Sequence, residues 1–152
     1  MPIVPLIELA AVRGRRLLGL DVGTRTVGLA LSDTRLVIAS PYDTIRRGKF
    51  AADAGAIAAI VARQDVGGFV VGLPVSMDGT EGPRCQSIRA FARNLLAVVD
   101  LPTAFWDERL STAAVERAMI AADMTRQRRA ATIDRAAAAY ILQGALDALA
   151  RA

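Results

Sequence analysis

Two continuous apolar runs constrain the fold of this chain more than any other feature of its sequence. Residues 17–20 form one run, which ends at Asp21, and residues 69–73 form the other, which ends at Pro74. Short runs without a polar face are typical of central strands that helices cover on both sides. Residues 50–64, which lie between the runs, are rich in alanine and carry apolar residues at helical spacing. The sequence therefore predicts a strand, a crossover helix and a second strand of one parallel sheet.

The remaining elements follow from periodicity and from turn residues. Residues 26–32 alternate between large and small side chains after a turn at Gly23, so they form a hairpin with the first apolar run. Pro83 suits the first turn of a helix, and Ser111 suits a helix N-cap. The other predicted elements are a strand at 41–46, helices at 83–99, 111–122 and 132–150, and a strand at 103–106.

This order of elements predicts a three-layer α/β domain with a mixed five-stranded sheet flanked by helices. It resembles the ribonuclease H-like architecture. The length of 152 residues suits one domain. We expect a flexible N-terminal extension over 1–15, followed by the domain at 16–152. Basic residues follow the first apolar stretch rather than precede it, unlike a secretory signal, and we expect a cytoplasmic protein.

Two residue types that catalyse many reactions are scarce. The chain has no histidine and a single cysteine, Cys85. A Ser-His-Asp or Cys-His nucleophile therefore has no base, and zinc sites built from His or several Cys are excluded. A hydrolase with this composition must rely on carboxylates and a bound metal.

Carboxylates stand where such a metal site is expected. Asp21 ends the first buried strand, and Asp107 and Glu108 follow the strand at 103–106. Open α/β sheets bind ligands beyond the carboxyl ends of their parallel strands. Because adjacent strand residues face opposite ways, we expect one of Asp107 and Glu108 to join Asp21 and the other to bind backbone or an arginine. Asp134 lies in the first turn of the last helix, where helix capping alone would explain it; its position with two other acids from distant segments favours a site.

Oxygen ligands without His or Cys select Mg²⁺ or Mn²⁺. Two such ions about 3.5–4 Å apart can stabilise both the attacking water and the leaving oxygen of a phosphodiester. Metal-dependent phosphodiester hydrolysis is therefore the reaction that fits these residues.

A polyanionic partner agrees with the charge of the chain, which is formally +4 at pH 7. The glycine-containing loop at 72–82 is a candidate phosphate seat through Gly79 and Thr80, although it could be an ordinary strand-to-helix connection. The candidate phosphate-binding arginines, each of which could equally belong to a solvated basic surface, are Arg25, Arg109, Arg126, Arg128 and Arg129. We expect the last three to lie in a loop before the final helix.

Four blocks of sequence resemble the signature blocks of the YqgF family, also called RuvX. The blocks read LGLDVGTRTVGLALSD at 18–33, VGLPVSMDGTEG at 71–82, DERLST at 107–112 and IDRAA at 133–137. They occur in the family's order, and the resemblance covers residues 16–150. The second block is the most specific of the four.

The resemblance implies a ribonuclease H-like endonuclease that trims the 5′ end of precursor 16S rRNA in the cytoplasm. It implies the acidic triad Asp21, Glu108 and Asp134, and so favours Glu108 over Asp107. It also implies structured RNA as the partner, with the small ribosomal subunit as a further one, and we expect a monomer or weak homodimer. Thr26 departs from the family, which often has a basic residue there, and the basic loop before residue 133 is thinner than usual.

Other functions remain open at this point. A RuvC-like Holliday junction resolvase would use the same acids on branched DNA, but it needs a two-fold dimer. A non-catalytic nucleic-acid-binding factor would have no need of clustered carboxylates. The Asp-x-Gly-Thr motif at Asp21 also resembles the phosphate loop of sugar kinases and actin-like ATPases, which pair two such domains and fit a chain of this length poorly.

Overall fold

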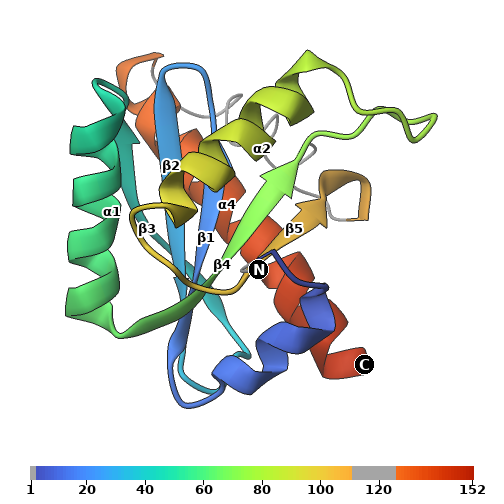
Figure 1. Ribbon diagram of the computed structural model, residues 1–152. Helices are drawn as coiled ribbons and strands as arrows, with labels where there is room; N and C mark the ends of the chain where they lie inside the picture. The colour runs from blue at the N-terminus through green and yellow to red at the C-terminus, as the bar shows by residue number, and fades with distance from the viewer. Residues whose placement is uncertain (1–2, 111–125) are drawn as a thin grey trace.

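The computed structural model describes residues 3–110 and 126–152, with the side chains of 126–133 excepted. Its core is a five-stranded sheet with the strand order β3-β2-β1-β4-β5 (Figure 1). The strands are β1 (Arg16–Val22), β2 (Thr26–Ser32), β3 (Ala39–Arg46), β4 (Val66–Leu73) and β5 (Thr103–Asp107). β2 runs antiparallel to β1 and β3, whereas β1, β4 and β5 are parallel. The predicted mixed sheet is confirmed.

Helices cover both faces of the sheet. The long helices are α1 (Phe50–Gln64), α2 (Pro83–Leu96) and α4 (Arg126–Arg151), and the short 3-10 helices are η1 (Leu6–Val12) and η2 (Glu108–Leu110). α1 and α2 lie on one face, and α4 lies behind the sheet on the other (Figure 1). The predicted helix at 111–122 lies outside the described residues. No helix in the described ranges is both long and apolar enough to cross a membrane.

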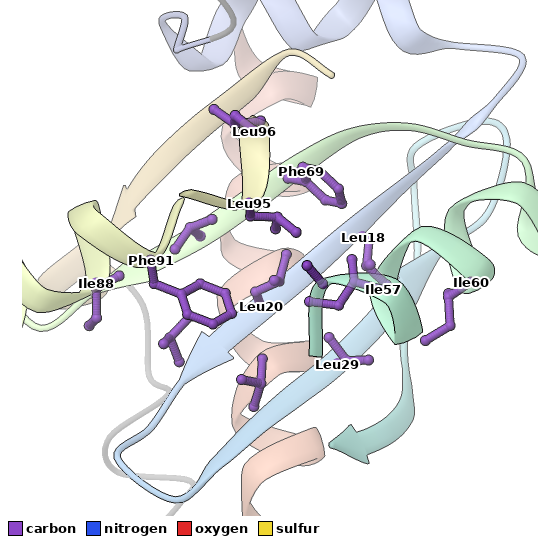
Figure 2. Close-up of a cluster of buried hydrophobic side chains, with 14 of the residues drawn as sticks. Leu18, Leu20, Leu29, Ile57, Ile60, Phe69, Ile88, Phe91, Leu95 and Leu96 are labelled. Carbon is purple, nitrogen blue, oxygen red and sulfur yellow. The ribbon is translucent and has the colours of Figure 1, made fainter. Parts of the chain in front are cut away.

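Alternating strand residues separate the core into two parts. Leu18, Leu20 and Leu29 pack with residues of α1 and α2 (Figure 2). Leu17 and Val70 point the other way and pack against α4 and η1. β1 and β4 are therefore buried on both sides, which explains why they read as continuous apolar runs.

Glycines in the sheet allow α4 to approach closely. A Cβ added at Gly28 would lie 2.0 Å from the carbonyl oxygen of Asp134, and one at Gly19 would lie 2.8 Å from Leu142 Cβ. Real Cβ atoms do not approach other atoms at these distances, so a larger residue at either position would force the helix away. The two glycines thereby position the first half of α4 over β2 and β1.

The N-terminal segment differs from the expectation of a loose extension. Leu9 in η1 is fully buried among residues of the α4 side of the core. The backbone N–H of Val4 donates a 2.8 Å hydrogen bond to the carbonyl of Thr103 at the start of β5. The segment packs because β5 is an edge strand whose backbone needs a partner.

The start of α4 also differs. The helix begins at Arg126 rather than near residue 132, so Arg126, Arg128 and Arg129 lie on helix backbone and not in a loop. Arginine, glutamine and alanine all favour helix, and the stretch before residue 132 consists of them.

Candidate active site

The parallel strands β1, β4 and β5 end at the same edge of the sheet, and Asp21 lies there. In the antiparallel pairing of β1 with β2, Asp21 lies opposite Gly28. In the parallel pairing of β1 with β4, Leu20 lies opposite Val71, so the next residues, Asp21 and Gly72, lie at the same level. Directly paired residues project to the same face of a sheet. Gly28 faces α4, so the half-buried side chain of Asp21 is on the α4 face as well.

Glu108 reaches the same face from the end of β5. Its Oε2 atom would be 3.2 Å from a Cβ added at Gly72, which would also contact Ile141 of α4. Gly72 therefore leaves room for a carboxylate between β4 and α4. This space lies next to Asp21 because Gly72 and Asp21 are neighbours in the parallel ladder.

Asp134 approaches from α4. Its carbonyl oxygen packs on Gly28, the ladder partner of Asp21. Its carboxylate Oδ2 accepts a hydrogen bond from the Thr26 hydroxyl. Asp134 continues the helix face that carries Ala138 and Ile141, both of which are buried against the sheet. The structure thus places Asp21, Glu108 and Asp134 on one face of one edge.

The three acids offer only carboxylate oxygens, which are the donors that Mg²⁺ and Mn²⁺ prefer. The donor chemistry of the site therefore fits a divalent cation. Across residues 3–110 and 126–152, however, no group of three or more His, Cys, Asp or Glu side chains is close enough to hold one metal ion. The three acids therefore lie on one face of the edge without converging on one point.

Asp107 takes the other role that the sequence left open. Its carboxylate is bound by Arg109, with Nη2 to Oδ2 at 2.6 Å and Nε to Oδ1 at 3.1 Å. The hydrogen bonds from Arg109 hold the pKa of the Asp107 carboxyl below its usual range. One of the adjacent acids therefore binds an arginine, as expected, and that pairing engages much of the Arg109 guanidinium.

The loop between β4 and α2 uses its own backbone donors. Gly79, which has a φ of 89°, donates its N–H to the Ser76 carbonyl at 2.8 Å. Thr80 donates both its N–H, at 3.0 Å, and its hydroxyl, at 2.7 Å, to Asp78 Oδ1. The hydrogen bonds from Thr80 lower the pKa of Asp78. In this conformation the loop binds phosphate poorly, because these donors are already hydrogen-bonded within it and the negative charge of Asp78 repels phosphate.

Arg25 and Arg109 are the candidate arginines with described side chains, and both are exposed. Arg25 lies in the β1–β2 turn, two residues after Gly23. The side chains of Arg126, Arg128 and Arg129 lie outside the described residues.

Three residues that contact this edge were not predicted from the sequence as candidate site residues. Thr26 bonds Asp134, Arg47 donates to the Gly23 carbonyl at 2.6 Å, and Arg84 donates to the Val22 carbonyl at 3.0 Å. Thr26 was visible only as a departure from the family pattern. Nothing in the local sequence relates Arg47 or Arg84 to the β1–β2 turn.

Solved structures with a similar fold include RuvC of T. thermophilus in complex with Holliday junction substrate. It has a TM-score of 0.57 at 12% identity, with 88% of this chain and 94% of that chain covered. The yeast mitochondrial Holliday junction resolvase Ydc2 has a TM-score of 0.54 at 10% identity, with 96% and 83% covered. At such low identity these likenesses establish the fold alone, and they confirm the predicted ribonuclease H-like architecture.

Sequence relatives are much closer. A protein of Paramagnetospirillum magneticum named "Putative pre-16S rRNA nuclease" is 60% identical over 149 residues, which cover 97% of this chain and 96% of the relative. A protein of Rhodospirillum rubrum with the same name is 63% identical over 139 residues, 91% of this chain and 86% of the relative. The family model for RuvX, described as Holliday junction resolvase, matches residues 15–148. This chain therefore belongs to the RuvX family.

Proposed function

We propose that this protein is an endonuclease that hydrolyses phosphodiester bonds and processes the 5′ end of precursor 16S rRNA during ribosome biogenesis. The observation that carries the proposal is the near full-length identity of 60% to a relative with the pre-16S rRNA nuclease name. The acidic edge of the sheet is consistent with it, because a nuclease without histidine needs carboxylates.

The proposed catalytic and metal-binding residues are Asp21, Glu108 and Asp134. Their support is their common position on the α4 face of the edge, with Gly72 and Gly28 leaving space beside them. Carboxylates that share a site repel one another, so a cation between them is bound favourably. A divalent ion, Mg²⁺ or Mn²⁺, would supply Lewis-acid stabilisation of the phosphate and activation of water at neutral pH.

The residues of the chain would orient the substrate and the ion. Thr26 holds the Oδ2 oxygen of Asp134 and so fixes the orientation of that carboxylate. Arg47 and Arg84 hold the carbonyls that follow Asp21, so the turn beside the carboxylate is stiff. Preorganisation of this kind reduces the reorganisation needed in the transition state.

Phosphate contacts are proposed for Arg25, Arg109, Arg126, Arg128 and Arg129. Gly79 and Thr80 could join them only if the hydrogen bonds within their loop opened. The proposed location is the cytoplasm. The proposed partners are structured RNA and, through it, the small ribosomal subunit, and the proposed active form is a monomer or weak homodimer.

A second candidate function is Holliday junction resolution, which the description of the matching family model favours. It would use the same acids on branched DNA. A resolvase cuts two strands symmetrically, so this function requires a two-fold dimer in solution.

The deciding experiment compares wild type with Asp21→Asn on precursor 16S rRNA and on a four-way DNA junction, each with Mg²⁺, Mn²⁺ or EDTA. We expect metal-dependent cleavage of the RNA by wild type and none by the variant. The variant should still bind RNA at least as tightly, because it lacks a negative charge next to the phosphates.

Asp107→Asn is the control for the chemical step. It removes the partner of Arg109, a proposed phosphate contact, so it can change RNA affinity but should retain metal-dependent cleavage. Cleavage by Asp21→Asn at the wild-type rate would remove Asp21 from catalysis. Cleavage of the junction alone would favour the resolvase.

A further inference from the structure

Five cationic residues lie in the turn that follows Asp21 and in the segments packed beside it. They come from the β1–β2 turn, from the end of β3 with its connection to α1, and from the first turn of α2. We name this group the cationic rim, and its members are Arg25, Arg46, Arg47, Lys49 and Arg84. All except Arg47 are exposed, and Arg47 is half-buried.

Direct contacts join the three segments. The backbone N–H of Arg47 donates a 2.8 Å hydrogen bond to the Arg25 carbonyl, which sets the β3–α1 connection against the β1–β2 turn. The Arg47 guanidinium also stacks over the Phe91 ring of α2, with its Cζ atom 5.1 Å from the ring centroid. Arg84 of α2 donates a 3.0 Å hydrogen bond to the Val22 carbonyl. Backbone and side-chain contacts therefore hold the three segments together, and Arg47 and Arg84 are fixed by their own side chains.

The rim reaches the carboxylates on the α4 face through Arg46. The register of β2 and β3 pairs Arg46 with Thr26, so both side chains project to the same face. Thr26 binds Asp134 on that face. Arg46 therefore lies on the face where Thr26 binds Asp134. Arg47 and Arg84 lie toward α2.

The charge at this end of the edge is not compensated by the ion pairs that the structure describes. Those pairs join Arg15, Arg89 and Arg109 to carboxylates, and no rim residue takes part in them. The segments 22–26 and 46–49 contain no acidic residue. Within the described part of the chain, two carboxylates are bonded to them: Asp134 accepts from Thr26, and the buried Asp53 accepts from the Gly48 N–H, so the five cations remain in excess. At the other end of the edge, the loop after β4 carries Asp78 and Glu81. A polyanion is therefore drawn to the β1–β2 end of the site.

We infer that the cationic rim binds the phosphodiester backbone of a nucleic-acid strand and directs that strand across the β1–β2 turn to Asp21. Arginine and lysine at a turn recognise phosphates through charge and N–H donors and read no base edges there. The binding itself is independent of cleavage; only the direction toward Asp21 rests on the proposed nuclease function.

The test measures binding in EDTA, where a metal-dependent nuclease leaves its substrate intact. Fluorescence anisotropy with labelled single-stranded RNA and DNA of the same sequence gives the affinity at several KCl concentrations. The test variant is Arg25→Gln/Arg46→Gln, because neither side chain has a described hydrogen bond to the fold. The control is Arg13→Gln/Arg35→Gln, which removes the same charge at the opposite edge, where Gly14 N–H bonds the Thr34 carbonyl.

We expect the rim variant to bind both strands roughly tenfold more weakly at low salt. The slope of log affinity against log salt should fall by about 1.4, since each phosphate contact on a single strand contributes about 0.7. The control should keep the wild-type slope. An unchanged slope in the rim variant, or an equal loss in the control, would overturn the inference, as would a loss confined to RNA or to DNA.

The same preparations, assayed with Mg²⁺, separate this inference from the proposed function. If binding depends on the rim but neither precursor 16S rRNA nor the four-way DNA junction is cleaved, the rim inference stands and the proposed nuclease function is wrong. If the protein cleaves but its binding does not depend on the rim, the nuclease function stands and the rim inference is wrong.

Discussion

At the scale of single residues, Thr26 links the hairpin to the last helix. Its hydroxyl donates to the Asp134 carboxylate, and 108 positions of sequence separate the two residues. A hydrogen-bonded carboxylate has a fixed orientation, which matters when its other oxygen must face a cation or a phosphate. Partners of metal-binding residues commonly contribute to affinity and rate in this way.

Thr26→Val tests that role because valine has the shape of threonine without the donor. We expect cleavage to fall by about 10–100-fold and the Mg²⁺ concentration for half-maximal activity to rise. Thr26→Ser keeps the hydroxyl and should retain most of the activity. Wild-type rates and Mg²⁺ dependence in Thr26→Val would show that the hydrogen bond has no part in the reaction.

At the scale of elements, the position of α4 depends on glycines in the strands beneath it. Gly28 contacts the backbone of α4 at Asp134, and Gly72 contacts Ile141 and Glu108. The sequence predicted most helices and strands well because their periodicity is local, and α1 matched the expected range 50–64. It could not predict where α4 crosses the sheet, because the crossing depends on which strand positions lack a Cβ.

Gly28→Ala should therefore displace the start of α4. The added Cβ would meet backbone at 2.0 Å, so the helix must move. We expect a loss of about 1–3 kcal/mol of stability, as for other overpacked sites, together with reduced cleavage because Asp134 moves. Chemical denaturation and the cleavage assay measure the two effects.

Gly55→Ala is the control for that variant. Gly55 is exposed in α1, where an added Cβ meets nothing within 4 Å. Alanine favours helix over glycine, so this variant should be more stable by about 0.5–1 kcal/mol. Equal stability of Gly28→Ala and wild type would mean that α4 adjusts without cost.

At the scale of the whole molecule, the N-terminal segment completes the α4 side of the core. Leu9 is fully buried, and η1 lies beside the C-terminal part of α4 (Figure 1). The expectation from sequence was a flexible extension over residues 1–15. Burial of this segment depends on a surface made by β5 and α4, which are distant in sequence.

Leu9→Ala should then cost about 2–5 kcal/mol of stability, as for other buried leucines. Ile7→Ala, at a side chain that is 53% exposed in the same 3-10 helix, should change stability by less than about 0.5 kcal/mol. Urea unfolding of both variants measures the difference. If both variants lower the free energy of unfolding by the same small amount, residues 1–15 are a loose extension after all.

The sequence by itself determined the order of the elements, the two strands buried on both faces, and the acids at the ends of β1 and β5. These features follow from residue periodicity and from the rule that parallel strands end at one edge. Only the tertiary structure decided that Thr26 holds Asp134, that Arg46 and Arg47 flank the β1–β2 turn, and that Leu9 is buried. Each of these joins segments far apart in the chain, and such contacts depend on how closely packed surfaces approach rather than on any local pattern.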